Sequence, residues 1–137
     1  MSTTITKRFT FESSHRLPNH DGKCRRNHGH SYKLFVTVTG DVLQADSHPK
    51  DGMIMDFGDL SEIVNRRIVS NWDHRFLAKG DEPDVEWLES ANVCRIGVRT
   101  TAENMAKLIF DTLVSEGVKV CQVRLYETES SYATISN

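Results

Sequence analysis

The sequence has no long apolar run, few cysteines and no excess of charge of either sign. Its longest apolar runs are a few residues, whereas roughly 20 are needed to cross a bilayer, so we expect no membrane partner. The 17 basic and 19 acidic residues give a net charge of −2, which argues against nucleic acid as a partner because nucleic-acid binders usually have a basic excess. The hydrophobic fraction of 38% is typical of soluble globular proteins and excludes collagen-like and low-complexity chains.

The three cysteines are odd in number and show no pairing rhythm. They are Cys24, Cys94 and Cys121, and the polar start of the chain does not resemble a secretory signal. Together these features predict free thiols and a cytoplasmic protein. A length of 137 residues predicts a single domain spanning 1–137.

Apolar residues recur at strand or helix spacing in six segments. Alternation predicts strands at 4–14, 28–39, 118–128 and 131–136, and the helical period predicts helices at 59–72 and 101–116. The intervening residues read as loops, with a helical turn expected near 85–88 in the long connection 78–99. The order β-β-α-α-β-β predicts an α+β fold in which two helices cover one face of an antiparallel four-stranded sheet.

Both predicted helices have residues that suit their ends. Asp59 followed by Glu62 resembles a capping arrangement, and Thr100 with Glu103 fits a capping box. Gly117 suits the position just after the second helix. A small sheet also leaves open edges, which closure by oligomerisation would cover.

Three histidines carry the clearest chemical signal. His28 and His30 are two residues apart at the start of a strand, so both rings lie on one face. His15 ends the preceding strand, and pairing of the two strands brings it close to the others. Three neutral imidazoles suit Zn²⁺ and leave a fourth position open, as in catalytic zinc sites. The alternative is three ordinary surface or core histidines.

Cys24 lies four residues before His28 and has two interpretations beyond an ordinary thiol. It is either the fourth ligand of a closed structural zinc site or a catalytic thiolate beside an open one. Lys23, Arg25 and Arg26 flank it and would lower a thiol pKa, which modestly favours the catalytic interpretation.

Two acidic positions complete the candidate site. Asp73 and His74 follow the first helix and could act together, although a surface pair is the simpler interpretation. Glu127 shares a strand face with Val123 and Leu125, and a carboxylate that ends an apolar face is either solvated or aimed into a polar cavity. A planar ligand edge with two N–H donors would satisfy such a carboxylate.

Several short motifs occur together in an order that resembles one family. They are Cys24 followed by His28-Gly29-His30, Asp56-Phe57-Gly58-Asp59, Asp73-His74-Arg75, Thr101-Ala102-Glu103-Asn104 and Tyr126-Glu127-Thr128. The chain resembles the 6-pyruvoyl-tetrahydropterin synthase / 6-carboxy-tetrahydropterin synthase family over nearly its whole length. The resemblance implies a tunnelling fold, in which trimers close a twelve-stranded barrel and two trimers form a homohexamer with active sites at subunit interfaces.

The resemblance also assigns roles residue by residue. It implies that His15, His28 and His30 bind zinc and that Cys24 is the catalytic base. These roles match the interpretation reached from residue spacing, and the resemblance selects the open zinc site from the two alternatives.

The remaining roles concern proton transfer and substrate binding. The resemblance implies that Asp73 and His74 tune and relay protons and that Glu127 anchors a pterin ring. Thr100 and Thr101 lie where the family contributes pterin contacts, although Thr100 could equally cap the helix.

The implied substrate is 7,8-dihydroneopterin triphosphate, a small molecule. We expect the branch that releases 6-carboxy-5,6,7,8-tetrahydropterin, acetaldehyde and triphosphate for 7-deazapurine (queuosine-type) synthesis. The alternatives are the pyruvoyl-forming branch and a non-catalytic structural zinc domain. The stretch between Leu77 and Thr100 is longer than is usual in short bacterial members, and the resemblance assigns it no role.

Overall fold

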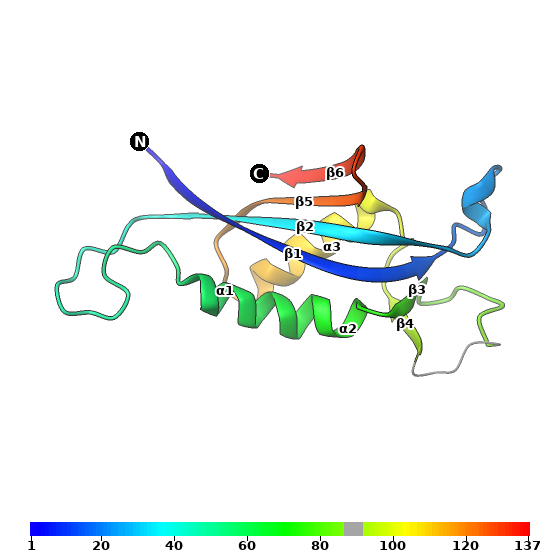
Figure 1. The fold of residues 1–137 in the computed structure, drawn as a ribbon, viewed down its shortest axis with the longest axis horizontal. Coiled ribbons are helices and arrows are strands. Elements are labelled where there is room, and N and C mark those ends of the chain that lie inside the picture. Colours follow the sequence, from blue (N-terminus) through cyan, green and yellow to red (C-terminus); the bar gives the residue numbers. More distant parts are fainter. Residues whose placement is uncertain (87–91) are drawn as a thin grey trace.

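The computed structural model describes residues 1–86 and 92–137, which form one six-stranded sheet with helices on one face (Figure 1). The strand order is β4-β3-β1-β2-β5-β6. The strands are β1 (Thr3–His15), β2 (His28–Gly40), β3 (Arg75–Lys79), β4 (Val93–Ile96), β5 (Val120–Thr128) and β6 (Ser131–Ser136). The helical elements are η1 (Lys23–Arg25), α1 (Phe57–Val64), η2 (Asn65–Val69), α2 (Ser70–Trp72) and α3 (Ala102–Ser115).

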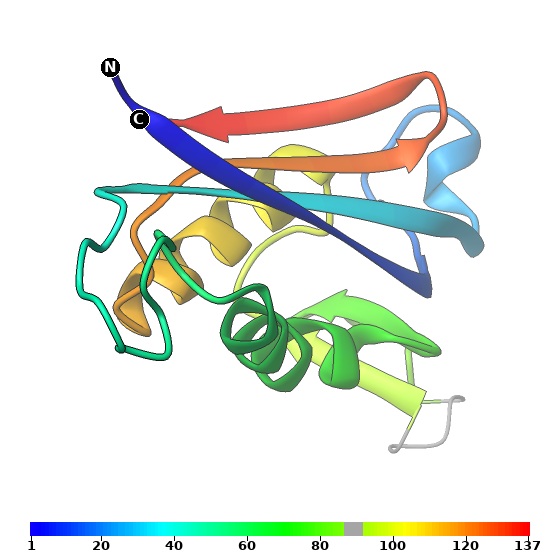
Figure 2. The same ribbon diagram turned by 60° about the vertical axis from the view of Figure 1, so that its left-hand side comes forward.

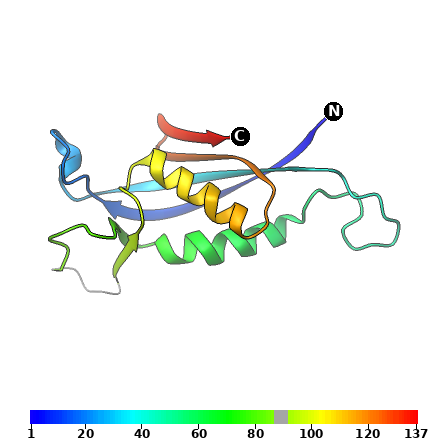
Figure 3. The same ribbon diagram turned by 180° about the vertical axis from the view of Figure 1, so that it is seen from behind.

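The long hairpin of β1 and β2 forms the centre of the sheet. The two strands pair antiparallel over their full lengths, from Thr3 opposite Gly40 to His15 opposite His28. Alternate side chains on one face are buried, including those of Phe11 and Leu34. Figures 2 and 3 show α1 and α3 side by side on this face, so the core lies between the hairpin and the two helices.

The structure confirms the α+β class and the antiparallel set β1, β2, β5 and β6, but the sheet has two strands more than expected and is mixed. β3 pairs parallel with both β1 and β4, beyond the predicted antiparallel edge. β3 escaped prediction because Phe76, Leu77 and Ala78 are all buried and therefore show no alternation. β4 has only four residues, too few to establish a pattern.

The first helix begins earlier than its predicted cap. Asp56 caps α1 by accepting a hydrogen bond from the backbone N–H of Gly58 at 2.6 Å, so the expected cap at Asp59 is wrong. The π-helical segment η2 then joins α1 to α2. The buried residues along this unit are spaced by four: Leu60, Val64, Ile68 and Trp72. An α-helix turns each four-residue step by about 40°, so a wider π turn keeps these side chains facing the sheet.

The second helix, α3, is capped by Thr101, whose hydroxyl accepts from the backbone N–H of Asn104 at 3.2 Å. The predicted capping box at Thr100 and Glu103 is therefore displaced by one residue. Gly117 has a φ of +81° just after the helix, as its position predicts.

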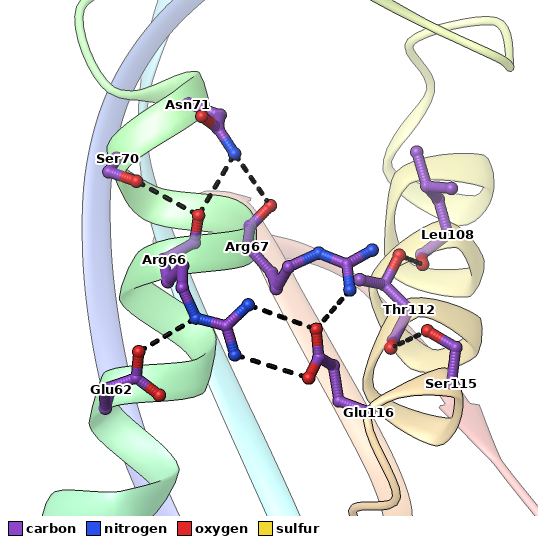
Figure 4. Close-up of polar contacts among 9 residues, drawn as sticks. All are labelled: Glu62, Arg66, Arg67, Ser70, Asn71, Leu108, Thr112, Ser115 and Glu116. Carbon is purple, nitrogen blue, oxygen red and sulfur yellow. Dashed lines mark hydrogen bonds and ion pairs between the residues drawn. The ribbon is translucent and has the colours of Figure 1, made fainter.

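Ion pairs join the two long helical units at one end. Figure 4 shows Arg66 and Arg67 of η2 both pointing at Glu116, which follows α3. Arg66 reaches the two carboxylate oxygens at 3.3 Å each and also pairs with Glu62 at 2.8 Å. Two consecutive arginines thus reach one carboxylate and add a polar contact between the helical units, whose positions are set mainly by the buried core.

The expected helical turn near 85–88 extends beyond the described residues. Within the part of the chain that the structure describes, no helix is long and apolar enough to span a membrane.

Candidate functional site

The three predicted histidine ligands meet at one end of the central hairpin. His15 ends β1 directly opposite His28 at the start of β2, and His30 lies two residues further along the same face. The ring centroids are 4.6 Å apart for His15 and His28, 5.1 Å for His15 and His30, and 5.0 Å for His28 and His30. One ligand atom from each ring lies within 4.8 Å of the others, so the cluster can hold a metal ion.

Backbone carbonyls orient two of these rings. The Nδ1–H of His15 donates to the Thr100 carbonyl at 2.8 Å, and the Nδ1–H of His28 donates to the Arg26 carbonyl at 2.7 Å. Because a carbonyl only accepts, each bond keeps the hydrogen on Nδ1 and the lone pair on Nε2. The structure therefore presents Nε2 of both rings as acceptors or metal ligands.

Burial leaves two of the ring nitrogens without partners. Within the described residues, neither Nε2 of His15 nor Nε2 of His30 has a hydrogen-bond partner, although both atoms are buried. Buried polar atoms are normally satisfied, and a metal ion bound by the three rings would satisfy both. The residues present thus fit a divalent transition metal, for which three imidazoles are suitable donors.

The electrostatics of the cluster favour neutral rings. Burial, helped by the neighbouring His28 and His30, lowers the pKa of His15 from 6.5 to about 4. Burial also lowers the pKa of His30, with a smaller contribution from His28. Neutral imidazole is the form that binds a metal, so both rings carry the required lone pair at neutral pH.

Glu127 lies beside the cluster. Its Oε2 atom is 3.4 Å from Nε2 of His30, and its side chain is 25% exposed. The carboxylate also accepts a hydrogen bond from the backbone of Ala102, the first residue of α3, and burial raises its pKa. It borders a hollow of about 390 Å³ between the start of α3 and the β5–β6 hairpin. A ligand in this hollow would contact the carboxylate, whereas none of the three histidines borders it.

Cys24 lies in η1, within the loop that joins β1 to β2 (Figure 1). Its carbonyl accepts from the backbone N–H of Leu17 at 2.7 Å, which holds the loop together near the histidine end of the hairpin. Its thiol is partly buried and free. Among the residues that the structure describes, the three histidines form a group that could hold one metal ion, and Cys24 is not part of that group. This arrangement matches the open site and not a closed site with a cysteine ligand.

Asp73 and His74 form a pair held by the backbone of β1. Nδ1 of His74 is 3.0 Å from Oδ2 of Asp73. The Glu12 N–H donates to Oδ1 of Asp73 at 2.8 Å, and this hydrogen bond is the main reason that the pKa of Asp73 is lowered. The His74 N–H donates in turn to the Glu12 carbonyl at 2.6 Å, and His74 adopts a φ of +60°.

The His74 side chain is 80% exposed. With His30 and Gly29 it borders an open hollow of about 450 Å³. His74, though not Asp73, therefore borders the same hollow as His30, and this hollow shares no lining residue with the one beside Glu127.

Thr100 and Thr101 have separate roles in the structure. Thr100 is fully buried and holds His15 through its carbonyl, with its hydroxyl 3.2 Å from the same ring nitrogen. Thr101 is half-buried and caps α3. Sequence reasoning missed the carbonyls that orient His15 and His28, because every residue has a carbonyl and its use depends on the path of the loop.

Comparison with known proteins gives a consistent result. Residues 4–137 match the family model described as 6-pyruvoyl tetrahydropterin synthase. A Haemophilus influenzae protein named 6-carboxy-5,6,7,8-tetrahydropterin synthase is 38% identical, with 93% of this chain and 94% of that protein covered. A Dictyostelium discoideum protein named 6-pyruvoyl tetrahydrobiopterin synthase is 32% identical, with 96% of each chain covered.

Solved structures support the same assignment. A Caenorhabditis elegans 6-pyruvoyl tetrahydropterin synthase gives a TM-score of 0.72 at 25% identity, covering 100% of this chain and 96% of that chain. An uncharacterized protein from Wolinella succinogenes gives a TM-score of 0.77 at 23% identity, covering 100% and 99% of the two chains. The predicted tunnelling fold is thereby confirmed, and the chain belongs to the 6-pyruvoyl tetrahydropterin synthase family of enzymes.

Proposed function

We propose that this protein is a zinc-dependent lyase that converts 7,8-dihydroneopterin triphosphate to 6-carboxy-5,6,7,8-tetrahydropterin, acetaldehyde and triphosphate. The observation that carries the proposal is the histidine cluster, in which His15 and His28 present Nε2 toward a common point beside Glu127. The relatives named for this activity, at up to 38% identity, support the choice of product.

The three histidines would hold the metal, and Glu127 would hold the substrate. When bound, Zn²⁺ supplies Lewis-acid polarisation of the substrate's side-chain oxygens. The Glu127 carboxylate accepts paired N–H bonds from the amino-pyrimidine edge of the pterin, which are strong because the acceptor is charged. The 3.4 Å separation between Glu127 and His30 supports this division of roles, because a pterin held by Glu127 would lie next to the histidines.

Proton transfer falls to the remaining residues. The Cys24 thiolate takes a proton from the substrate, and His74 returns one. Asp73 accepts from Nδ1–H of His74, which orients the ring. His74 is 80% exposed in the single chain, so a neighbouring subunit would have to enclose it before it could act in a site shielded from water.

Assembly and location follow the same proposal. We expect a homohexamer, built as a dimer of trimers, that closes active sites at subunit interfaces in the cytoplasm. Lys23, Arg25 and Arg26 are exposed around Cys24 and are the candidates for binding the triphosphate. The pathway is that of 7-deazapurine (queuosine-type) synthesis.

Two alternatives remain to be tested. The Dictyostelium relative supports a second candidate product, 6-pyruvoyl-tetrahydropterin, formed by triphosphate elimination. A non-catalytic zinc domain is less consistent with the geometry, because a closed structural site needs a fourth protein ligand and the described cluster has three.

Mass spectrometry of the products formed from 7,8-dihydroneopterin triphosphate tests the proposal directly. We expect 6-carboxy-tetrahydropterin and an equal amount of acetaldehyde, with both formed about 100-fold or more slowly by the Cys24→Ala variant. Formation of 6-pyruvoyl-tetrahydropterin without acetaldehyde would replace the proposed product by the alternative. Unchanged substrate with the zinc-loaded protein would contradict the enzymatic proposal.

A further inference from the structure

One buried carboxylate lies outside the site described so far. Glu82, in the connection between β3 and β4, is 2% exposed, and its side chain is fully buried. Its Oε2 atom is 3.1 Å from Nε of Arg16, and its Oε1 atom is 3.5 Å from Nη1 of Arg99. These two arginines come from segments that are far apart in the sequence.

The two arginines flank the hydrogen bond that orients His15. Arg16 directly follows His15, and Arg99 directly precedes Thr100. Between them, the His15 Nδ1–H donates to the Thr100 carbonyl at 2.8 Å, and the Thr100 hydroxyl lies 3.5 Å from the Arg16 carbonyl. Glu82 therefore links the two backbone segments whose spacing decides whether the His15–Thr100 bond forms.

Charge holds this linkage together: Arg16 makes a hydrogen-bonded ion pair with Oε2 of Glu82, and Arg99 makes an ion pair with Oε1 at 3.5 Å without a hydrogen bond. A buried carboxylate is costly unless it is paired, and a buried guanidinium nitrogen has the same requirement. Nη1 of Arg99 is buried and has no hydrogen bond within the described part of the chain, so its pairing with Glu82 is its main compensation. Arg16 also donates to the carbonyls of Pro83 and Asp84, which ties the Glu82 segment to the end of β1.

We propose that Glu82 is a positioning residue that holds the His15 imidazole, through Arg16, Arg99 and the Thr100 carbonyl, in the orientation that presents Nε2 to the metal. The role of a metal at His15 rests on the proposed function, whereas the orientation of the ring does not. The long connection after β3 thus contributes Glu82, which orients His15 without contacting it.

The Glu82→Gln variant tests this role, with Asp81→Asn as the matched control. Glutamine keeps the shape of the side chain but removes its charge, so both arginines lose their counterion. Asp81 is adjacent and 77% exposed, its ion pair is with Lys79, and Arg99 is the last and smallest cause that lowers its pKa. Its change therefore removes an exposed charge from the same loop while both ion pairs of Glu82 stay in place.

The first readout needs no metal. In ¹⁵N-detected NMR of the histidine rings of the metal-free protein, we expect His15 to be a single Nδ1–H tautomer in the parent and Asp81→Asn proteins. In Glu82→Gln we expect a mixture of tautomers, because the Thr100 carbonyl is no longer held in place. A merely structural role would lower the melting temperature without changing the tautomer.

The second readout is zinc affinity, measured by competition with a chromogenic chelator at a temperature where every variant is folded. Outer-shell changes typically weaken metal binding 10- to 100-fold, and an indirect linkage predicts the lower end, about 10-fold, for Glu82→Gln and less than twofold for Asp81→Asn. If Glu82→Gln does not fold, Arg99→Gln removes only the arm next to Thr100, and we expect the same two changes.

A single His15 tautomer and unchanged zinc affinity in the folded variant would overturn the proposal. Failure of the parent protein to bind zinc would instead contradict the proposed function, and the tautomer measurement would still decide the role of Glu82.

Discussion

Replacing Glu127 with glutamine isolates the contact that should hold the substrate. The carboxylate accepts with two oxygens, whereas the amide keeps one acceptor and turns the other position into a donor. One of the two N–H bonds to a pterin is therefore lost, and its donor faces another donor. The substitution leaves the volume of the side chain almost unchanged, so the sheet and helix around it should stay as they are.

The magnitude of the effect follows from the burial of the site. A hydrogen bond to a charged group contributes about 1.5–3 kcal/mol. The Glu127 side chain is 25% exposed, so the bond is only partly screened and a middle value of about 2 kcal/mol applies. Since each 1.4 kcal/mol is tenfold, pterin binding should weaken by about 30-fold.

Calorimetry with pterin-6-carboxylate measures this difference, and Glu103→Gln is the matched control. Glu103 is exposed, borders the same hollow and raises the pKa of Glu127 by repulsion. The Glu103→Gln variant should therefore change the affinity for the pterin less than threefold. Equal affinity of Glu127→Gln and the parent, with zinc content unchanged, would refute the role of Glu127. An equal loss in both variants would show that the charge of the hollow matters and not the paired contact.

Four further outcomes are expected. His28→Ala should lower bound zinc to well under one per chain by elemental analysis, and full occupancy would remove the metal assignment. Cys24→Ala should keep its zinc but lose turnover by about 100-fold or more in a product assay, whereas loss of both would favour a structural site. Light scattering should give about six times 15.6 kDa, and a monomer at micromolar concentration would contradict the interface sites. Hydrogen bonds from Lys50 and Gly58 hold the pKa of Asp56 below 3.8, so the ionised carboxylate stabilises the fold above that pH. Asp56→Ala should therefore lower Tm at pH 7, and the difference in Tm between variant and parent should vanish as the pH falls through the lowered pKa.

The sequence predicted the antiparallel part of the fold because period-two alternation survives wherever one strand face is solvated. β2 alternates clearly between Tyr32 and Val38, and the structure buries those positions on one face. β3 is covered on both faces, so its pattern is a short apolar run that carries no period. The parallel pairing of β3 with β1 is also a long-range contact that no local pattern encodes.

In the candidate site too, a local pattern encodes some features and long-range contacts decide others. The histidine cluster could be predicted because His28 and His30 must share a face and His15 lies at the end of the partner strand. Glu127 was visible because a carboxylate at the end of an apolar strand face needs a partner. The β-hairpin register thus brings the three histidines together.

What the sequence could not reveal is how these rings are oriented, and this orientation decides whether the cluster can bind a metal. The Thr100 and Arg26 carbonyls keep the hydrogens of His15 and His28 on Nδ1, away from the cluster. Both carbonyls lie in connections, one before α3 and one before β2, whose paths depend on tertiary contacts. The residue types at these positions matter less than where their backbone runs, so substitutions far from the histidines can alter the histidine cluster by moving either loop.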